Sequence, residues 1–502
     1  MTVLAISKVV ARDDVCKLGH VQPSVNSSPE SAAARDLPRE LGLTDLALTQ
    51  ILFVVGLPWV GVAAKMGPAH VAFWLLAMVL FYVPSAVVVI HLNRRMPLEG
   101  GLYQWAKLGF NELTGFLVAW NLWLFAILNT SETGLQATQY LAYVIGPRAE
   151  TLAASKPLIA LVSAGLFAAL VWLAILGLGV GKWVHKAGGA LMLVTFAALL
   201  VVPWLNLANG SLAEFHPLAT ATPVVSILSL NLLGKMGFGA FGGFEYVAIH
   251  AGECRNPVRT IGRSVMVAAP IIAVMFILGT SSVLALIPIE QIDLIAPIPQ
   301  VLTAGFRPLG YAAAIAPITI VVLLIVRIAQ ASVMFTGNTR MPMVAGWDGL
   351  LPEWFTRIDP RRRTPVNSIV FVGAATFAFS VIGLVGVGKQ EAFQLLWNAS
   401  AIFYALTYLV MFAIPIAGLR SAAARRPLWL TASALSGLLM TLLFVVLSIL
   451  PIIQVESRLT FALKISSLIV VANLIGVAIF RQAVRKGSIS ASVASGTSSG
   501  RK

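Results

Sequence analysis

The stretch LGKMGFGAFGGFE, residues 233–245, interrupts an apolar run of membrane length with five glycines and carries two charges, Lys235 and Glu245. Glycine destabilises a helix, and a charged side chain is costly inside a bilayer. A membrane helix tolerates irregular backbone only where it is buried in protein or lines a wet cavity. The stretch therefore indicates a solute-binding site near the middle of a membrane protein.

The composition of the whole chain requires a membrane environment. Hydrophobic residues make up 58% of the sequence, charged residues 11%, and the mean hydropathy is +0.88. A soluble protein needs far more polar surface than this. Uncharged runs such as 71–90 and 158–179 have the length with which a helix crosses a bilayer, and they lack the alternation of barrel strands. These features predict an all-α integral membrane protein.

About twelve segments of membrane length are expected. They cover residues 46–66, 69–92, 113–145, 157–179, 187–207, 226–250, 264–287, 311–343, 367–386, 392–417, 428–450 and 460–480. Basic residues gather in alternate loops, for example at Arg94 and Arg95 and at Arg361–Arg363. This pattern predicts that both termini are cytoplasmic in a multi-pass protein of the cell (plasma) membrane. It also accounts for the net charge of +15 by topology and lipid contact, without nucleic acid.

The two ends of the chain differ from the middle. Residues 1–41 are polar and mixed in charge, and residues 484–502 are rich in serine and glycine. Both compositions are typical of disordered tails. Residues 42–483 are expected to form one transmembrane transporter domain.

A second interruption lies in the first span, where VVGLPWVG (54–61) contains Gly56, Pro58 and Gly61. Proline removes a backbone donor and clashes with the preceding turn. Five spans separate the start of this span from the start of the span that contains 233–245. Paired interruptions in corresponding spans are the best sequence indication of a secondary-transporter site between inverted repeats. The expected limits are 46–207 for the first repeat, 226–417 for the second, and 428–480 for two extra helices.

Interrupted helices expose backbone groups that suit a zwitterion. N–H groups at the start of one half-helix favour a carboxylate, and carbonyl groups at the end of another favour an ammonium group or a cation. The alternative is that the glycines serve close helix packing. Two dense clusters in corresponding spans favour the binding site.

Several motifs resemble those of a known superfamily. PLEGGLYQW (97–105) and GFLVAWNLW (115–123) resemble segments at its second and third helices. FGGFEYVAIHAGECRNPVRTIGRS (241–264) is similar to its sixth helix and the signature that follows. TRMPMVAGWDGLLPEWF (339–355) and TPVNS (364–368) resemble a later cytoplasmic signature. On these motifs, the chain resembles the amino acid–polyamine–organocation superfamily.

The resemblance covers about residues 42–480 in one order. It implies a leucine-transporter-type fold with five-plus-five inverted repeats, discontinuous helices 1 and 6, and two C-terminal helices. It also implies amino acid or amine transport by alternating access. The 241–245 segment matches well, whereas GLPWVG (56–61) matches the first-helix motif only loosely. Matched positions that are expected to serve gating and loop structure are Asn256, Pro257, Arg259, Arg340, Asp348 and Gly349.

Ionisable residues inside the expected spans are functional candidates because of their cost there. Glu245 follows the glycine cluster, and burial favours its neutral form, so it is a candidate for proton coupling or for a structural hydrogen bond. Glu132 and Arg327 are candidates for a buried ion pair. Alternatively, Arg327 or Lys235 holds a substrate carboxylate, and Glu132 holds an ammonium group.

The expected substrate-binding residues combine both interruptions with these charges and with aromatic rings. They are Gly56, Pro58, Trp59, Gly61, Glu132, Phe241, Gly242, Gly243 and Arg327. Phe241 is the preferred gate because it lies inside the sixth-span interruption.

These observations predict a secondary transporter of amino acids, driven by proton coupling or exchange. One alternative is a polyamine or organic amine permease, although cationic substrates would favour more carboxylates than Glu132 and Glu245. Another is a transporter-like nutrient sensor. The loops contain no metal-ligand spacing, nucleophile elbow or phosphate-binding loop, so neither an enzyme nor a cofactor or metal is expected. The expected partners are a small solute and membrane lipids.

Overall fold

The structure is a computed structural model of the chain. It describes residues 41–96, 101–146, 154–245, 254, 256–310, 314–339, 350–362, 364–384, 389–417, 427–452, 455 and 457–496. Within these ranges the chain is helical and contains no strand, apart from an isolated bridge between Leu41 and Cys254. The N-terminal tail up to residue 40 and the signature residues Arg340, Asp348 and Gly349 lie outside the described residues.

The α-helices follow the predicted apolar segments closely. Those up to residue 208 are α3 (Leu43–Val54), α4 (Trp59–Ala64), α5 (His70–Ala77), α6 (Val83–Arg95), α7 (Leu102–Gly109), α8 (Glu112–Ser131), α9 (Thr133–Ile145), α11 (Lys156–Leu176) and α12 (Leu178–Ala208). Those that follow are α13 (Ile227–Gly234), α14 (Pro257–Leu286), α15 (Pro297–Phe306), α16 (Ile315–Asn338), α18 (Val366–Ile382), α19 (Lys389–Ala417), α20 (Leu428–Leu447) and α21 (Arg458–Gly496).

Nine helical runs in the described part of the chain are long and apolar enough to cross a membrane. This makes the chain a multi-pass membrane protein. Three of the twelve predicted segments fall short of that length. Two of these are the interrupted segments, and the third is α18, a helix of 17 residues.

The first predicted interruption is present. Helix α3 ends at Val54, and α4 begins at Trp59 with Pro58 as its N-cap. Between them the chain turns tightly, with the Gly56 N–H bonded to the Val54 carbonyl at 2.8 Å. Pro58 has no N–H, so the helix cannot continue through it with its hydrogen bonds intact.

The second interruption is also present, although its form is more gradual. Helix α13 passes into a π-helical turn, η4 (Lys235–Gly239), before the chain leaves the helical path at Gly242 and Gly243. Gly243 has φ of +135°, a conformation that residues with a side chain rarely adopt. Residues 246–253 lie outside the described part of the chain.

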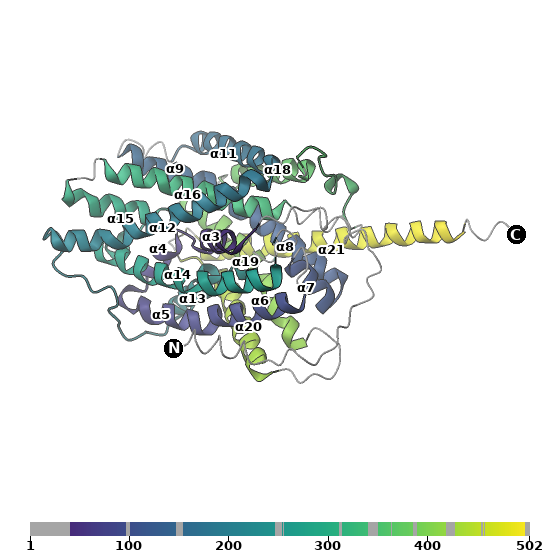
Figure 1. Cartoon of the computed structure of the whole chain (residues 1–502), viewed down its shortest axis with the longest axis horizontal. Helices are drawn as coiled ribbons and strands as arrows, with labels where there is room; N and C mark the ends of the chain where they lie inside the picture. Colours follow the sequence, from purple (N-terminus) through teal and green to yellow (C-terminus); the bar gives the residue numbers. More distant parts are fainter. Residues whose placement is uncertain are drawn as a thin grey trace. The chain divides into compact units, whose positions relative to one another are not determined.

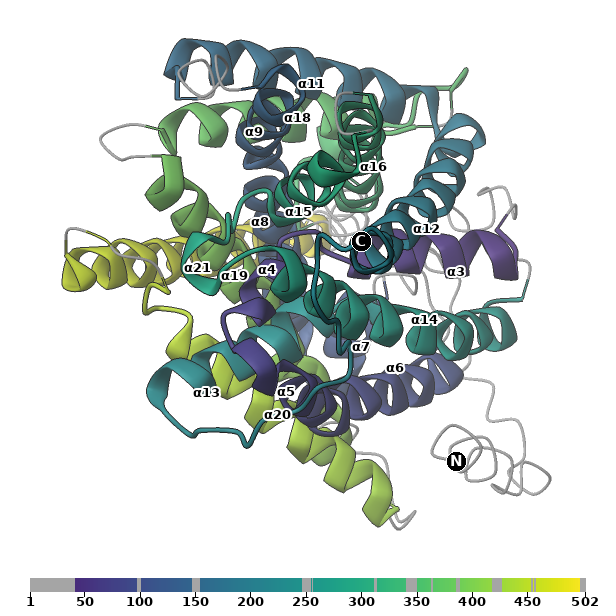
Figure 2. The same ribbon diagram turned by 90° about the vertical axis from the view of Figure 1, so that its left-hand side faces the viewer.

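The interrupted segments lie among the central helices of the transmembrane unit. In Figures 1 and 2, α3, α4 and α19 lie at the level between α11 and α18 along one edge and α5 and α20 along the opposite one. Helix α19 packs against α8 and α20, and α3 packs against α12, α14 and α16. This arrangement encloses irregular backbone in protein, as a bilayer requires.

Some glycines of the opening stretch serve packing, as the alternative interpretation expected. A Cβ atom on Gly234 would lie 3.2 Å from the Phe444 backbone, and one on Gly237 would lie 2.8 Å from Met440. Both neighbours belong to the α20 helix. Small residues thus allow α13 and η4 to approach α20 closely.

At the C-terminal end, a helix overlaps the segment that was predicted to be a disordered tail, and the disorder of that segment stays a prediction. Helix α21 continues to Gly496, well beyond residue 484, where the tail was expected to begin. Extending an existing helix adds one hydrogen bond per residue without a new nucleus. The Ser/Ala-rich composition of this segment is compatible with such an extension, and composition alone does not reveal it.

Candidate functional site

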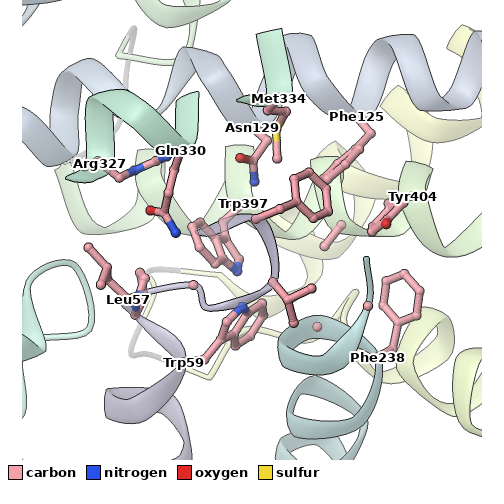
Figure 3. Close-up of a pocket in the computed structure, with 17 residues that line it drawn as sticks. Leu57, Trp59, Phe125, Asn129, Phe238, Arg327, Gln330, Met334, Trp397 and Tyr404 are labelled. Atoms are coloured by element: carbon pink, nitrogen blue, oxygen red, sulfur yellow. The ribbon is translucent and has the colours of Figure 1, made fainter. Parts of the chain in front are cut away.

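A cavity of about 80 Å³ lies where the two interruptions meet α8, α16 and α19. Figure 3 shows Phe125, Asn129 and Gln330 on one side of it and Trp59 on the opposite side. Its lining residues are Phe53, Val54, Gly56, Leu57, Pro58, Trp59, Phe125, Asn129, Phe238, Gly239, Gly242, Arg327, Gln330, Met334, Trp397, Ala401 and Tyr404.

Five of the predicted binding residues line this cavity. They are Gly56, Pro58, Trp59, Gly242 and Arg327. The interruptions supply the first four because a helix that stops exposes its backbone to the space beside it. The binding of a solute by these five residues stays a prediction.

The other four predicted residues, Gly61, Gly243, Phe241 and Glu132, do not line the cavity. A Cβ on Gly61 would meet Pro297 at 2.8 Å, so this glycine serves the contact between α4 and α15. A Cβ on Gly243 would meet Phe53 and Val54 at 2.7–2.8 Å, so Gly243 allows close contact with the end of α3. Neither residue borders the cavity.

Phe241, the preferred gate, also points away from the cavity. Its ring stacks on Tyr82 at 4.2 Å and meets Trp74 and Phe276 edge-on at 5.2 and 5.5 Å. The side chain is fully buried in this aromatic cluster. Its position within the interruption was the reason for the prediction, but the face on which a side chain emerges depends on the turn that precedes it.

The expected ion pair between Glu132 and Arg327 is present. Arg327 Nη2 lies 2.5 Å from a Glu132 carboxylate oxygen and 2.9 Å from Thr133 Oγ1, and Arg327 Nε donates to Gln136. Glu132 is fully buried, and its second oxygen has no hydrogen-bond partner in the described part of the chain. Since Arg327 lines the cavity and Glu132 does not, the pair presents its positive member to the cavity.

Glu245 is buried beside the cavity and separated from it by one side chain. Its two carboxylate oxygens accept hydrogen bonds from Tyr404 and Tyr408. Tyr404 lines the cavity, and Tyr408 accepts a hydrogen bond of 2.7 Å from the Gly243 N–H. A hydrogen-bonded path therefore joins the cavity to the carboxylate and to the backbone of the second interruption.

Aromatic rings form most of the apolar lining. Trp59 and Trp397 meet edge-on at 5.2 Å, and Phe125 stacks on Tyr404 at 4.1 Å with nearly parallel planes. Phe238 packs edge-on against Tyr404 at 5.6 Å. Such rings can enclose the apolar side chain of a small solute.

Gln330 was missed by the sequence analysis and holds the first interruption in place. Its Nε2 donates to the carbonyls of Leu52 and Val55 at 2.8 and 2.7 Å. These bonds satisfy carbonyls that the end of α3 leaves without helical partners. The carbonyls of Leu52 and Val55 are therefore already hydrogen-bonded, although carbonyls at such a helix end were expected to bind the solute.

Other lining residues were also missed, among them Asn129, Trp397 and Tyr404. Asn129 carried a signal, since a polar side chain in the middle of a membrane helix is an exception. Tyr404 and Tyr408 carried a second sequence signal, because residues four apart share one helix face and place two hydroxyl groups together. Trp397 carried no signal within its apolar helix.

Comparison with known proteins places the chain in a family. The amino acid permease model matches residues 41–479. An uncharacterized transporter of Legionella pneumophila is 24% identical over 75% of this chain and 80% of its own length. The branched-chain amino acid permease BcaP of Bacillus subtilis is 24% identical over 73% of this chain and 81% of its own length.

The crystal structure of MhsT in complex with L-phenylalanine shares the fold. It superposes with a TM-score of 0.57 at 14% identity, over 88% of this chain and 99% of MhsT. MhsT has the leucine-transporter-type fold that the motifs implied. With the interrupted helices and the cavity between them, these matches make the protein a transporter of amino acids or amines and not an enzyme. The chain belongs to the amino acid permease family of the amino acid–polyamine–organocation superfamily.

Proposed function

We propose that this protein is a secondary active transporter that moves neutral amino acids across the cell membrane by alternating access. The observation that carries the proposal is the cavity beside both interruptions. Its volume of about 80 Å³ accommodates roughly five to eight water-sized groups, at ~10–15 Å³ each. A small or medium-sized neutral amino acid has a comparable number of non-hydrogen atoms.

The charge of the lining favours a carboxylate-bearing solute over a polyamine. Arg327 is the charged residue of the lining, and no Asp or Glu borders the cavity in the described part of the chain. A polyamine would bring its positive charges toward the guanidinium without a carboxylate to compensate them. We infer that the solute carboxylate lies toward Arg327 and Asn129, with the apolar side chain among Phe125, Phe238 and Trp397.

Glu245 is our candidate for proton coupling. It can take up and release a proton through the hydroxyl of Tyr404, which borders the solute cavity. A change in its charge also affects Tyr408, which holds the Gly243 N–H. Protonation is thereby linked both to the solute and to the backbone of the second interruption.

The fold itself supports two further proposals of topology. The twelve segments form five-plus-five inverted repeats with two additional helices, and the strongly basic loops lie in the cytoplasm with both termini. Labelling of single cysteines in the loops 209–226 and 356–362 from either side of sealed vesicles tests the orientation.

Uptake into proteoliposomes tests the function. The panel contains L-leucine, L-phenylalanine, L-arginine, agmatine and putrescine, each with and without an inward proton gradient. We expect uptake of a neutral amino acid, stimulated by the gradient. Glu245→Gln should abolish the stimulation and retain exchange against internal amino acid, because the cavity is left intact.

Glu391→Gln is the matched control, because Glu391 is a partly exposed carboxylate in the first turn of α19, 3.4 Å from Lys464. This variant should retain the gradient effect. Uptake of amines alone would replace the proposal with the polyamine alternative. A folded protein that transports nothing in the panel would favour the nutrient sensor.

A further inference from the structure

A second, smaller cavity adjoins the first one. The two share Pro58, Trp59 and Trp397, so the edge-on tryptophan pair forms the wall between them. Leu294 and Ile452 also line the second cavity. Leu294 lies in the connection between α14 and α15, and Ile452 lies in the connection between α20 and α21. The proposed orientation places both connections outside the cell.

Lys235 lines this outer cavity and is nearly fully buried, with 2% of its surface exposed. Its ammonium group donates to Asn398 Oδ1 at 3.0 Å and to Ser448 Oγ at 3.4 Å, and it lies 5.7 Å from the Phe444 ring centroid. In the part of the chain that the structure describes, no carboxylate lies within ion-pair distance of it.

A buried cation without a counter-charge is costly, and proteins normally pair or hydrogen-bond such groups fully. Lys235 differs in this respect from Arg327, the other buried cation described above, which has Glu132 as its partner. The missing charge is therefore a feature of this position and points to a ligand that supplies it.

Two more buried polar atoms at the same cavity have no partner. Among the described residues, Asn398 Nδ2 and Gln394 Oε1 make no hydrogen bond, and both residues line the cavity beside Lys235. The side-chain N–H groups of Asn398 are therefore available to a ligand, while Oδ1 of the same side chain accepts from the Lys235 ammonium group. An anion that reached Lys235 would find a second N–H on Asn398.

From this arrangement we propose that Lys235 and Asn398 form an outer carboxylate site, where a solute is held before it passes the Trp59–Trp397 pair. The proposal rests on the proposed function and deepens it. The ligand is the carboxylate group of the transported amino acid. The cavity of about 10 Å³ has room for roughly one water-sized group, which matches a single carboxylate oxygen, so entry of the whole solute requires the tryptophans to separate.

The face of α19 supports a sequential path. Gln394 and Asn398 lie one turn apart at the outer cavity, and Ala401 and Tyr404 continue along the same helix at the central cavity. Trp397 directly precedes Asn398 on this helix and lines both cavities. A carboxylate released by Lys235 can then reach Arg327 once the tryptophan wall opens.

The test measures L-leucine uptake into proteoliposomes and its competition by L-leucinol, which keeps the ammonium group and side chain but lacks the carboxylate. Lys235→Met should raise the apparent KM for L-leucine about tenfold or more, the effect of losing a charged hydrogen bond. The inhibition constant of L-leucinol should change less than about twofold. Lys464→Met, at an exposed lysine, is the control and should leave both unchanged.

Asn398→Asp provides a second variant of nearly the same shape. Its fixed carboxylate would occupy Lys235, so it too should raise the KM for L-leucine and spare L-leucinol. Equal weakening of both compounds in Lys235→Met would mean a structural role and would overturn the proposal. So would a KM within twofold of the wild type.

Replacing chloride with gluconate in the buffer tests whether the anion at Lys235 is chloride or the carboxylate of the solute. If wild-type uptake depends on chloride and Lys235→Met removes that dependence alone, the site binds chloride and the carboxylate assignment fails. Wild-type protein that takes up no amino acid refutes the proposed function itself. Wild-type uptake with an unaffected Lys235→Met refutes only the outer site.

Discussion

Breaking the Glu132–Arg327 pair should strongly destabilise the protein. Glu132 is completely buried, and Arg327 supplies the hydrogen bond to its first oxygen. Its second oxygen has no partner among the residues that the structure describes. Arg327→Met therefore leaves a buried carboxylate with no hydrogen bond from the described residues. The expected loss is roughly 3–5 kcal/mol in the free energy of unfolding, the usual cost of removing one partner of a buried pair.

A double-mutant cycle isolates the pair. Glu132→Leu alone leaves a buried guanidinium that remains charged, and it should cost a similar amount. The double variant Glu132→Leu/Arg327→Met removes both charges, and its cost should fall to about 1–3 kcal/mol, since Gln136 and Thr133 still lose a donor. The sum of the two single-variant losses in unfolding free energy would then exceed the loss in the double variant by several kcal/mol.

The assay is equilibrium unfolding in mixed detergent micelles, followed by circular dichroism. Additive costs in the double variant would refute the reasoning, because independent sites show no coupling. A loss below about 1 kcal/mol in Arg327→Met would also refute it, since that is the value of an exposed pair.

Two further predictions concern the interruptions. Gly243→Ala should abolish folding or transport, because Gly243 has φ of +135° and the new Cβ would lie 2.7 Å from Phe53. Gly165→Ala is the control, because nothing lies within 4 Å of its new Cβ, and it should leave the melting temperature and uptake unchanged. Gln330→Ala leaves the Leu52 and Val55 carbonyls without their donor and should lower stability by about 1–3 kcal/mol per carbonyl, measured by the same detergent unfolding.

The sequence predicted the helices and their interruptions because each has a local cause. An apolar run of bilayer length is helical in a membrane, and Pro58 and Gly243 disrupt helices through their own backbone properties. The Glu132–Arg327 pair was predictable for a similar reason. An ionised group inside a bilayer needs a partner, and the described spans offered few candidates.

The lining of the cavity was much harder to predict. In a soluble helix the buried face is apolar and the opposite face polar, so periodicity reveals orientation. A membrane helix is apolar both toward lipid and toward protein, so Trp397 and Phe125 look like any other apolar residues. Phe241 shows the converse error, because its place in an interruption did not reveal the face on which its ring emerges.

Side-chain caps at both interruptions suggest how the protein can change conformation. Gln330 on α16 binds the end of α3, and Tyr408 on α19 binds the Gly243 N–H. Movement of either broken segment against its partner helix therefore exchanges a few net hydrogen bonds, at about 0.5–1.5 kcal/mol each. An uninterrupted helix in their place would have to break its own backbone hydrogen bonds in order to bend. In the proposed alternating-access cycle, the two capped interruptions would act as hinges that open at little cost wherever solute, water or another side chain replaces the cap.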